Sequence, residues 1–251
     1  MANLKSEAGF FDTCVQDNVR KPLAKYYAIT RDSQNHYEEL LFRDCEGKQV
    51  LEYGCGTGSY ALPMAKRGAR VFGIDISPGS VDLARKHAAE AGEIRAEFKV
   101  MDAMNLEYDD SSFDLVIGTG ILHHLDIHKS FREICRVLKP GGRACFYEPL
   151  GHNPALNLFR KATPKMRTDD EHPLRRCDLL GLKEYFDTSS YRFFHLATFG
   201  ALPFLNTKVF WPLVDVCEGM DRVAFRLVPL IRWWAWYTTL EYIGPKKADI
   251  A

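Results

Sequence analysis

From Lys48 to Pro149, short apolar or β-branched runs alternate with longer segments in which the apolar residues have helical spacing. Short β-branched runs favour strands, and their alternation with helices is typical of βαβ units and a mostly parallel sheet. The pattern therefore predicts an α/β fold with a doubly wound sheet. The predicted strands are residues 49–54, 69–75, 96–102, 113–120 and 143–149, and the predicted helices are residues 59–68, 80–92 and 128–142.

The pattern differs on both sides of this core, residues 48–150. Residues 1–47 mix charged and aromatic side chains at helical spacing and are predicted to form an N-terminal helical cap. After Pro149 the alternation breaks, and residues 151–232 are interpreted as a mainly helical insertion that covers the substrate. The insertion is predicted to contain a sixth strand at 191–199 and a helix at 208–232. Residues 233–251 are predicted to form a final antiparallel strand, 234–243, and a tail.

Length and composition indicate one globular domain. The chain has 251 residues, of which 46% are apolar and 26% charged, so it can bury one sizeable core. Its 33 basic and 33 acidic residues cancel to a net charge of +0, and no block of like charge stands out. A polyanion is held mainly by clustered positive charge, so nucleic acid is not expected as the main partner.

The seven cysteines are scattered and none forms a CxxC pair, which argues against a zinc ribbon and against a disulfide framework. The first residues lack the apolar run of a secretion signal. No uncharged apolar stretch reaches the roughly 18 to 20 residues that span a bilayer. A cytoplasmic protein in a reducing compartment is therefore expected, and its oligomeric state stays open.

The strongest chemical signal is LEYGCGTG, residues 51–58, directly after the first predicted strand. Glycine at a strand-to-helix turn tolerates positive φ and lets the backbone approach a ligand closely. Asp75 ends the next predicted strand, where a carboxylate can accept hydrogen bonds from two ribose hydroxyls. A nicotinamide enzyme is disfavoured, because Ser59 stands where GxGxxG needs its third small residue. The alternative is a glycine turn that binds no ligand.

With these motifs, the stretch from Val50 to Pro149 resembles the class I S-adenosylmethionine-dependent methyltransferases of the broad small-molecule type. The resemblance rests on residues 51–58, GIDIS at 73–77, VMDAMNL at 100–106, FDLVIGTGILHHL at 113–125 and LKPGG at 138–142. It covers about 100 residues and is specific for the cofactor rather than for the acceptor. It implies a Rossmann-like sheet, S-adenosylmethionine as the cofactor and S-adenosylhomocysteine as its product.

The resemblance also implies a role for each motif. The three glycines would pass under the methionine part of the cofactor, while Glu52 would steady their loop or meet the amino group. Asp75 would hold the ribose and Asp102 would accept from the adenine amino group, with Ile76 and Ala103 beside the ring. The implied cofactor-binding residues are Glu52, Gly54, Cys55, Gly56, Gly58, Asp75, Ile76, Asp102, Ala103, Thr119, Gly120 and Tyr26.

Thr119 and Gly120 would lie under the sulfonium, and an aromatic face of Tyr26 or Tyr27 would close over it. His123 and His124 follow the fourth predicted strand, where substrate pockets of this fold open. An imidazole titrates near neutrality, so either histidine is a candidate catalytic base. The alternative is that the pair serves packing or helix capping.

A second group of polar residues lies in and around the predicted insertion. It could line an acceptor pocket, or it could be a solvated, turn-rich loop. Because it lacks a metal-ligand spacing, no metal is expected. The group consists of Glu148, His152, Asp169, Asp170, Glu171 and His172.

The C-terminal third holds all four tryptophans. Core packing of an added layer is the favoured interpretation, with a greasy acceptor pocket or a membrane contact through Trp211, Trp233 and Arg232 as alternatives.

The leading hypothesis is an enzyme of secondary or lipid metabolism that methylates oxygen, nitrogen or carbon on a small hydrophobic molecule. Alternatives are a protein that binds the cofactor without turning it over, and a lipid or quinone methyltransferase at a membrane surface. Methylation of protein or RNA is disfavoured by the neutral charge.

Overall fold

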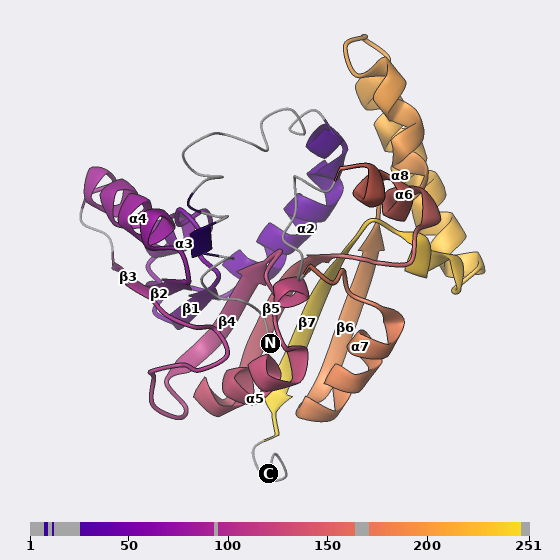
Figure 1. The fold of residues 1–251 in the computed structure, drawn as a ribbon. Helices are drawn as coiled ribbons and strands as arrows, with labels where there is room; N and C mark the ends of the chain where they lie inside the picture. Colours follow the sequence, from indigo (N-terminus) through magenta and orange to yellow (C-terminus); the bar gives the residue numbers. More distant parts are fainter. Residues whose placement is uncertain (1–7, 10–11, 13–25, 93–94, 164–170, 247–251) are drawn as a thin grey trace.

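A computed structural model of the chain describes residues 8–9, 12, 26–92, 95–163 and 171–246, and of Tyr26 only the backbone. Its centre is a seven-stranded sheet in the order β3-β2-β1-β4-β5-β7-β6 (Figure 1). The strands are β1 (Gln49–Tyr53), β2 (Arg70–Asp75), β3 (Ala96–Val100), β4 (Phe113–Thr119), β5 (Leu138–Pro149), β6 (Phe186–Phe194) and β7 (Tyr237–Pro245).

Strands β1 to β5 pair in parallel, while β7 is antiparallel to both of its neighbours. The predicted α/β fold, mostly parallel with an antiparallel final strand, is confirmed. Strands β2 and β3 extend the sheet on one side of β1, and β4 returns on the other side. Ligands of such sheets lie beyond the carboxyl ends of the strands at this reversal, between β1 and β4.

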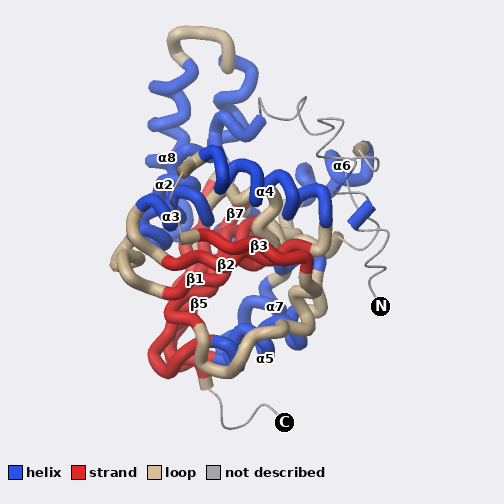
Figure 2. Tube along the Cα trace, turned by 90° about the vertical axis from the view of Figure 1, so that its left-hand side faces the viewer, coloured by secondary structure: helices blue, strands red, loops and turns tan. Residues whose placement is uncertain are grey.

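Helices cover both faces of the sheet (Figure 2). On one face, α2 (Arg31–Phe42), α3 (Ala61–Lys66) and α4 (Pro78–Glu90) contribute to a core cluster with β1 and β2. On the other face, α5 (Ile127–Val137) and α7 (Arg176–Gly181) pack in a second cluster. The start of α5 is fixed by Asp126, whose carboxylate accepts from the Lys129 N–H at 3.1 Å, a typical N-cap.

The insertion forms a helical unit next to the β7-β6 edge. It contains α6 (Pro154–Ala162), the 3₁₀ helix η6 (Ala197–Phe204) and α8 (Phe210–Leu227), and η6 and α8 project beyond the sheet in Figure 1. A third core cluster, built around Ile29, Ala201, Phe210 and Val214, joins this unit to the segment before α2. The N-terminal cap and the insertion therefore meet.

Several predicted boundaries are wrong, including the start of β6, which is at Phe186 instead of 191. The third predicted helix ends at Val137, and residues 138–142 already belong to β5, because Leu138 pairs with Phe113. Strand β6 ends at Phe194 instead of continuing to 199. The Asp221 carboxylate of α8 accepts from the Leu196 and Ala197 N–H groups and so starts η6.

The helix predicted for residues 208–232 is divided, because Val228 and Pro229 separate α8 from the short helix η7 (Ile231–Trp234). The final strand accordingly begins at Tyr237. Within the part of the chain that the structure describes, no helix is both long and apolar enough to cross a membrane.

Candidate active site

The glycine loop leaves the carboxyl end of β1 and folds back toward β2. Gly54, Gly56 and Gly58 have φ values of +71°, +49° and +85°. At Gly54 the need for glycine is also steric, because an added Cβ would lie 2.8 Å from the side chain of Ile121. At Gly56 such a Cβ would meet no atom within 4 Å, so the loop faces open space there. The buried Cys55 ties the loop down, since its N–H donates to the Ile74 carbonyl at 2.8 Å.

Glu52 of β1 binds the end of this loop where it enters α3. Its carboxylate accepts from the backbone N–H groups of Tyr60 at 3.2 Å and Ala61 at 2.8 Å, where α3 begins. The side chain is only 4% exposed. Burial raises the pKa of Glu52 to about 8, although the two N–H groups act in the opposite direction. The geometry is that of a residue that steadies the loop, one of the two roles expected for it.

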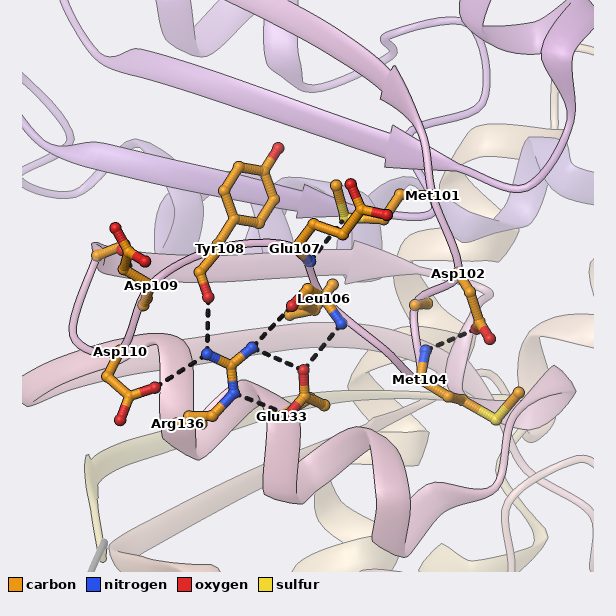
Figure 3. Close-up of polar contacts among 12 residues, drawn as sticks. Met101, Asp102, Met104, Leu106, Glu107, Tyr108, Asp109, Asp110, Glu133 and Arg136 are labelled. Atoms are coloured by element: carbon orange, nitrogen blue, oxygen red, sulfur yellow. Dashed lines mark hydrogen bonds and ion pairs between the residues drawn. The ribbon is translucent and has the colours of Figure 1, made fainter.

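Two carboxylates stand at the ends of neighbouring strands. Asp75, at the end of β2, accepts from the N–H groups of Gly56 at 2.8 Å and Ser77 at 2.9 Å. Asp102 follows β3 and accepts from the Met104 N–H at 2.8 Å (Figure 3). Ile76 is half-buried and Ala103 is buried next to them. Both carboxylates are thus oriented by the backbone at the edge where the resemblance places ribose and adenine.

Arg136 of α5 fixes the segment that carries Asp102 (Figure 3). Its guanidinium donates to the carbonyls of Leu106 at 2.9 Å and Tyr108 at 2.7 Å, and it pairs with Glu133 at 2.8 Å. The Glu133 carboxylate also accepts from the Leu106 N–H. The hydrogen bond to Glu133 raises the pKa of Arg136 above its ordinary value. The adenine side of the site therefore rests on a fixed loop.

A cavity of about 1020 Å³ lies beside this edge, over the ends of β4 and β5. Thr119 and Gly120, which the resemblance places under the sulfonium, are part of its wall. Its aromatic lining consists of Tyr27, Tyr60, Tyr147, Phe159, Phe199, Trp234, Trp236 and Tyr237. Its polar lining includes Gln34, His123, His124, Asn153, Arg160 and Glu171.

The two histidines form part of the 3₁₀ helix η3 (Leu122–His124) and are buried, with ring centroids 4.2 Å apart. His123 Nδ1 lies 2.7 Å from the carboxylate of Glu148, which is fully buried at the end of β5. The other carboxylate oxygen of Glu148 accepts from the Ile121 and Leu122 N–H groups, both at 2.8 Å. A carboxylate so placed orients the imidazole toward the cavity.

The structure brings only part of the second predicted group together. Glu171 reaches the cavity, but His152 does not line it; its Nε2 accepts from the Arg176 N–H at 2.9 Å. His172 contributes its backbone, whose N–H donates to the His123 carbonyl at 2.7 Å. Asp169, Asp170 and the Tyr26 side chain lie outside the described residues.

Sequence reasoning missed several cavity residues. Tyr60 and Tyr147 could have been found, because Tyr60 directly precedes α3 in the turn after β1, and Tyr147 lies near the carboxyl end of β5. Trp236 and Tyr237 were assigned to the interior of a strand, although they lie at the start of β7, beside Tyr27 and the end of β5. No local pattern distinguishes such positions from ordinary core.

Comparison with known proteins adds a family assignment for the central segment. A family model described as "Methyltransferase domain" matches residues 51–146. A demethylmenaquinone methyltransferase of Clavibacter sepedonicus is 39% identical over 116 residues, 46% of either chain. A ubiquinone biosynthesis O-methyltransferase of Idiomarina loihiensis is 34% identical over 139 residues, 55% of either chain. The chain thus spans about half the length of these curated relatives.

Among solved structures, the chain is similar to Haemonchus contortus phosphoethanolamine N-methyltransferase 2, bound to phosphomonomethylethanolamine and S-adenosylhomocysteine. The TM-score is 0.65 at 17% identity, and the alignment covers 94% of this chain and 59% of the other. At this identity the likeness shows a shared fold alone. It extends over the insertion as well as the core.

Proposed function

Because residues 51–146 form a methyltransferase domain of the class I S-adenosylmethionine-dependent family, we propose that the chain transfers the methyl group of S-adenosylmethionine to a small hydrophobic acceptor. The observation that carries this proposal is the junction at Thr119 and Gly120. These two residues belong to the motif expected under the sulfonium, and they also form part of the wall of the large aromatic cavity. A methyl group held there faces an acceptor in the cavity.

The cofactor would lie along the carboxyl edge of β1, β2 and β3. The open space at Gly56 admits its methionine part, and Asp75 and Asp102 hold ribose and adenine through charge-assisted hydrogen bonds. The N–H groups of Gly56 and Ser77 already orient the Asp75 side chain, so ordering it costs little free energy when the cofactor binds.

In the reaction, an oxygen, nitrogen or carbon atom of the acceptor forms a bond to the methyl carbon. The methyl–sulfur bond breaks, and its electron pair stays on the sulfur of S-adenosylhomocysteine. Positioning of the acceptor and exclusion of water supply much of the rate enhancement. A cavity walled by aromatic rings can provide both. The apolar wall, and relatives named for quinone methylation, favour a hydrophobic acceptor.

If the acceptor atom carries a proton, His123 is the candidate base. A carboxylate can only accept, so the Nδ1 that faces Glu148 carries a hydrogen and Nε2 offers its lone pair to the cavity. The buried carboxylate also stabilises the imidazolium that forms. The His124 ring lies beside it, tilted by 39°, and is the alternative base.

Methyl transfer is tested by incubating the chain with S-adenosylmethionine labelled in the methyl group and a cell extract, followed by mass spectrometry. The expected product is an apolar small molecule that carries one added labelled methyl group. Binding of the cofactor without any labelled product would instead support a non-catalytic, cofactor-binding role.

A second candidate function is methylation of a lipid or quinone at a membrane surface. It is favoured by an apolar stripe on α8, formed by Val216, Met220, Val223 and Leu227, each at least 58% exposed. The spacing places these residues along one side of the helix. Trp234 is 50% exposed and also lines the cavity, whereas Trp233 is buried and cannot serve the expected contact.

The membrane function is tested by flotation with vesicles of phosphatidylglycerol and phosphatidylcholine. The wild-type chain is expected to float, and the double substitution Val223→Glu with Leu227→Glu is expected to abolish flotation. Leu180→Glu, at an exposed apolar position on α7, is the control. A wild-type chain that stays at the bottom of the gradient would remove this candidate.

A further inference from the structure

Three side chains with metal-binding atoms converge at the cavity. One nitrogen each from His123 and His124 and one carboxylate oxygen from Glu171 lie within 4.8 Å of one another. All three residues line the cavity, and they come from segments almost 50 residues apart in sequence. We propose that His123, His124 and Glu171 bind a divalent transition-metal ion that ligates an oxygen of the acceptor. The role in the reaction rests on the proposed methyl transfer, whereas the binding itself does not.

The first support is the environment of His123. Its Nδ1 is engaged by the fully buried Glu148 at 2.7 Å, which leaves Nε2 for a metal ion. Histidines that ligate metals in proteins commonly donate their other ring N–H to a carboxylate, which fixes the ring and makes the ligand more basic. Glu148 is itself fixed by two backbone N–H groups. The outer shell of a metal site is therefore already present.

The second support is the way in which the fold places Glu171. The adjacent His172 N–H donates to the His123 carbonyl at 2.7 Å. Three residues after Glu171, the Leu174 N–H donates to the Pro149 carbonyl at 3.1 Å, and the Leu174 carbonyl accepts from the Gly151 N–H at 2.9 Å. Leu174 is buried. The segment that carries Glu171 is thus anchored to η3 and to the end of β5.

The third support is the chemistry of the donor set. Two imidazoles and one carboxylate are a common set for catalytic zinc and for non-haem iron(II), and such sites keep at least one position open. Bonds of about 2.1 Å in a tetrahedral site put ligand atoms roughly 3.4 Å apart, so a bound ion would draw the three side chains slightly together. The open position would face the cavity.

An ion in this position changes what the site can do. It binds an acceptor hydroxyl and lowers its pKa, so that the oxygen is a nucleophile near neutral pH. The proton leaves to solvent, the oxygen takes the methyl group, and S-adenosylhomocysteine is released as before. His123 then serves as a ligand instead of a base. The acceptors selected are those with a hydroxyl that can ligate a metal, such as phenols with a neighbouring oxygen.

The binding is tested on the full chain, freed of metal with a chelator and dialysed. Titration with Zn²⁺ in a calorimeter is expected to show one equivalent, and Co²⁺ is expected to give the visible absorption of an ion with nitrogen and oxygen ligands. Glu171→Gln and His124→Gln should weaken binding by more than the roughly 10- to 100-fold typical of a lost outer-shell partner. Glu148→Gln should fall within that range.

Matched controls are Glu184→Gln and His128→Gln, which lie away from the cavity and should bind like the wild-type chain. Circular dichroism establishes that each variant is folded. Absence of wild-type binding, or equal binding by folded Glu171→Gln and His124→Gln, would overturn the proposal.

Titration of the same samples with S-adenosylhomocysteine separates the two proposals. Cofactor binding without Zn²⁺ binding refutes the metal site alone. Zn²⁺ binding without cofactor binding refutes the proposed methyl transfer and leaves the metal site standing.

Discussion

The cofactor edge, formed by the ends of β1, β2 and β3, differs from the cavity over β4, β5 and β7 in how its residues are placed. At the cofactor edge, backbone conformation and backbone hydrogen bonds position the residues. Glycines with positive φ turn the chain, and Glu52, Asp75 and Asp102 accept hydrogen bonds from backbone N–H groups at most 19 residues away in sequence. Around the cavity, side chains from distant segments pack together, as Tyr27 does on Trp236.

The difference has a physical origin. A loop that must approach a ligand closely needs particular backbone conformations, and only a few residue types supply them. An apolar wall needs only volume and shape, which many aromatic and aliphatic combinations supply. The match to the methyltransferase-domain model covers the first region and stops at residue 146, before most of the cavity wall. We therefore expect substitutions at the cofactor edge to act through strain and lost hydrogen bonds, and those at the cavity to act on turnover.

The largest effect is expected for Gly54→Ala. The residue has φ +71°, and its new Cβ would lie 2.8 Å from Ile121. We expect a loss of about 2–5 kcal/mol in the free energy of unfolding, from left-handed backbone strain and overpacking together. Gly47→Ala is the control, since Gly47 also has φ +71° but meets no atom within 4 Å. Equal losses in urea unfolding would show that close packing at the loop is unimportant.

The next effect concerns the cavity. If His123 acts on the acceptor, His123→Gln should lower turnover by roughly 100-fold or more and leave the affinity for S-adenosylhomocysteine unchanged. His128→Gln on α5 is the control, because His128 Nδ1 lies 3.0 Å from the Tyr185 hydroxyl and the residue lies outside the cavity wall. A fall of cofactor affinity and melting temperature together would identify His123 as a packing residue of η3.

Asp75→Ala tests the cofactor edge by binding. Loss of the ribose hydrogen bonds should weaken S-adenosylhomocysteine binding by about 1–3 kcal/mol, or about 5- to 150-fold, in calorimetry. The exposed Asp82 of α4, paired with Arg85 at 3.0 Å, supplies the control substitution Asp82→Ala. Unchanged affinity in Asp75→Ala would remove Asp75 from the ribose role.

The smallest effects, taken per pH unit, are opposite pH dependences of the stability contributed by the two regions. Burial raises the pKa of Glu52 from 4.5 to about 8, so the unfolded chain ionises first as pH rises. The free energy of unfolding should then fall between these values, by at most about 1.4 kcal/mol per pH unit. Burial lowers the pKa of His195, beside the cavity wall, from 6.5 to about 3. The unfolded chain takes up that proton first, so stability should fall as pH drops below 6.5.

Urea unfolding at a series of pH values measures both slopes. Glu52→Gln should remove the loss on the alkaline side and His195→Gln the loss on the acid side, each leaving the other slope in place. Slopes that persist in the matching variant would assign the pH dependence to other groups.

The contrast between local and long-range contacts also explains which elements the sequence predicted correctly. Strand β1 was predicted at 49–54 and observed at Gln49–Tyr53, because the signal, apolar residues followed by glycines, is local. Strand β6 was misplaced because its end depends on Asp221, whose carboxylate comes from α8, 24 residues or more along the chain from the N–H groups it accepts. Local patterns carry no record of such contacts.

The residues of the candidate site likewise fall into those that local sequence predicts and those that only the fold brings together. The glycine turn and Asp75 were predicted from their spacing, and Asp102 was predicted from the resemblance to the methyltransferase family. The pairing of His123 with Glu148 was not found, since it joins η3 to the end of β5 across 25 positions. The segment of Glu171 is joined to them through the backbone bond from the His172 N–H to the His123 carbonyl. The expected absence of a metal site rested on sequence spacing alone. Sequence spacing does not reveal side chains that only the fold brings together, such as His123, His124 and Glu171.

The central claim is that one edge of the sheet presents a methyl donor to the adjoining cavity. A crystal structure of the chain with S-adenosylhomocysteine tests it most directly. The account predicts ribose at Asp75, adenine at Asp102 and the sulfur at Thr119 and Gly120, open to the cavity lined by His123. A cofactor bound elsewhere, or with its sulfur walled off from that cavity, would contradict it.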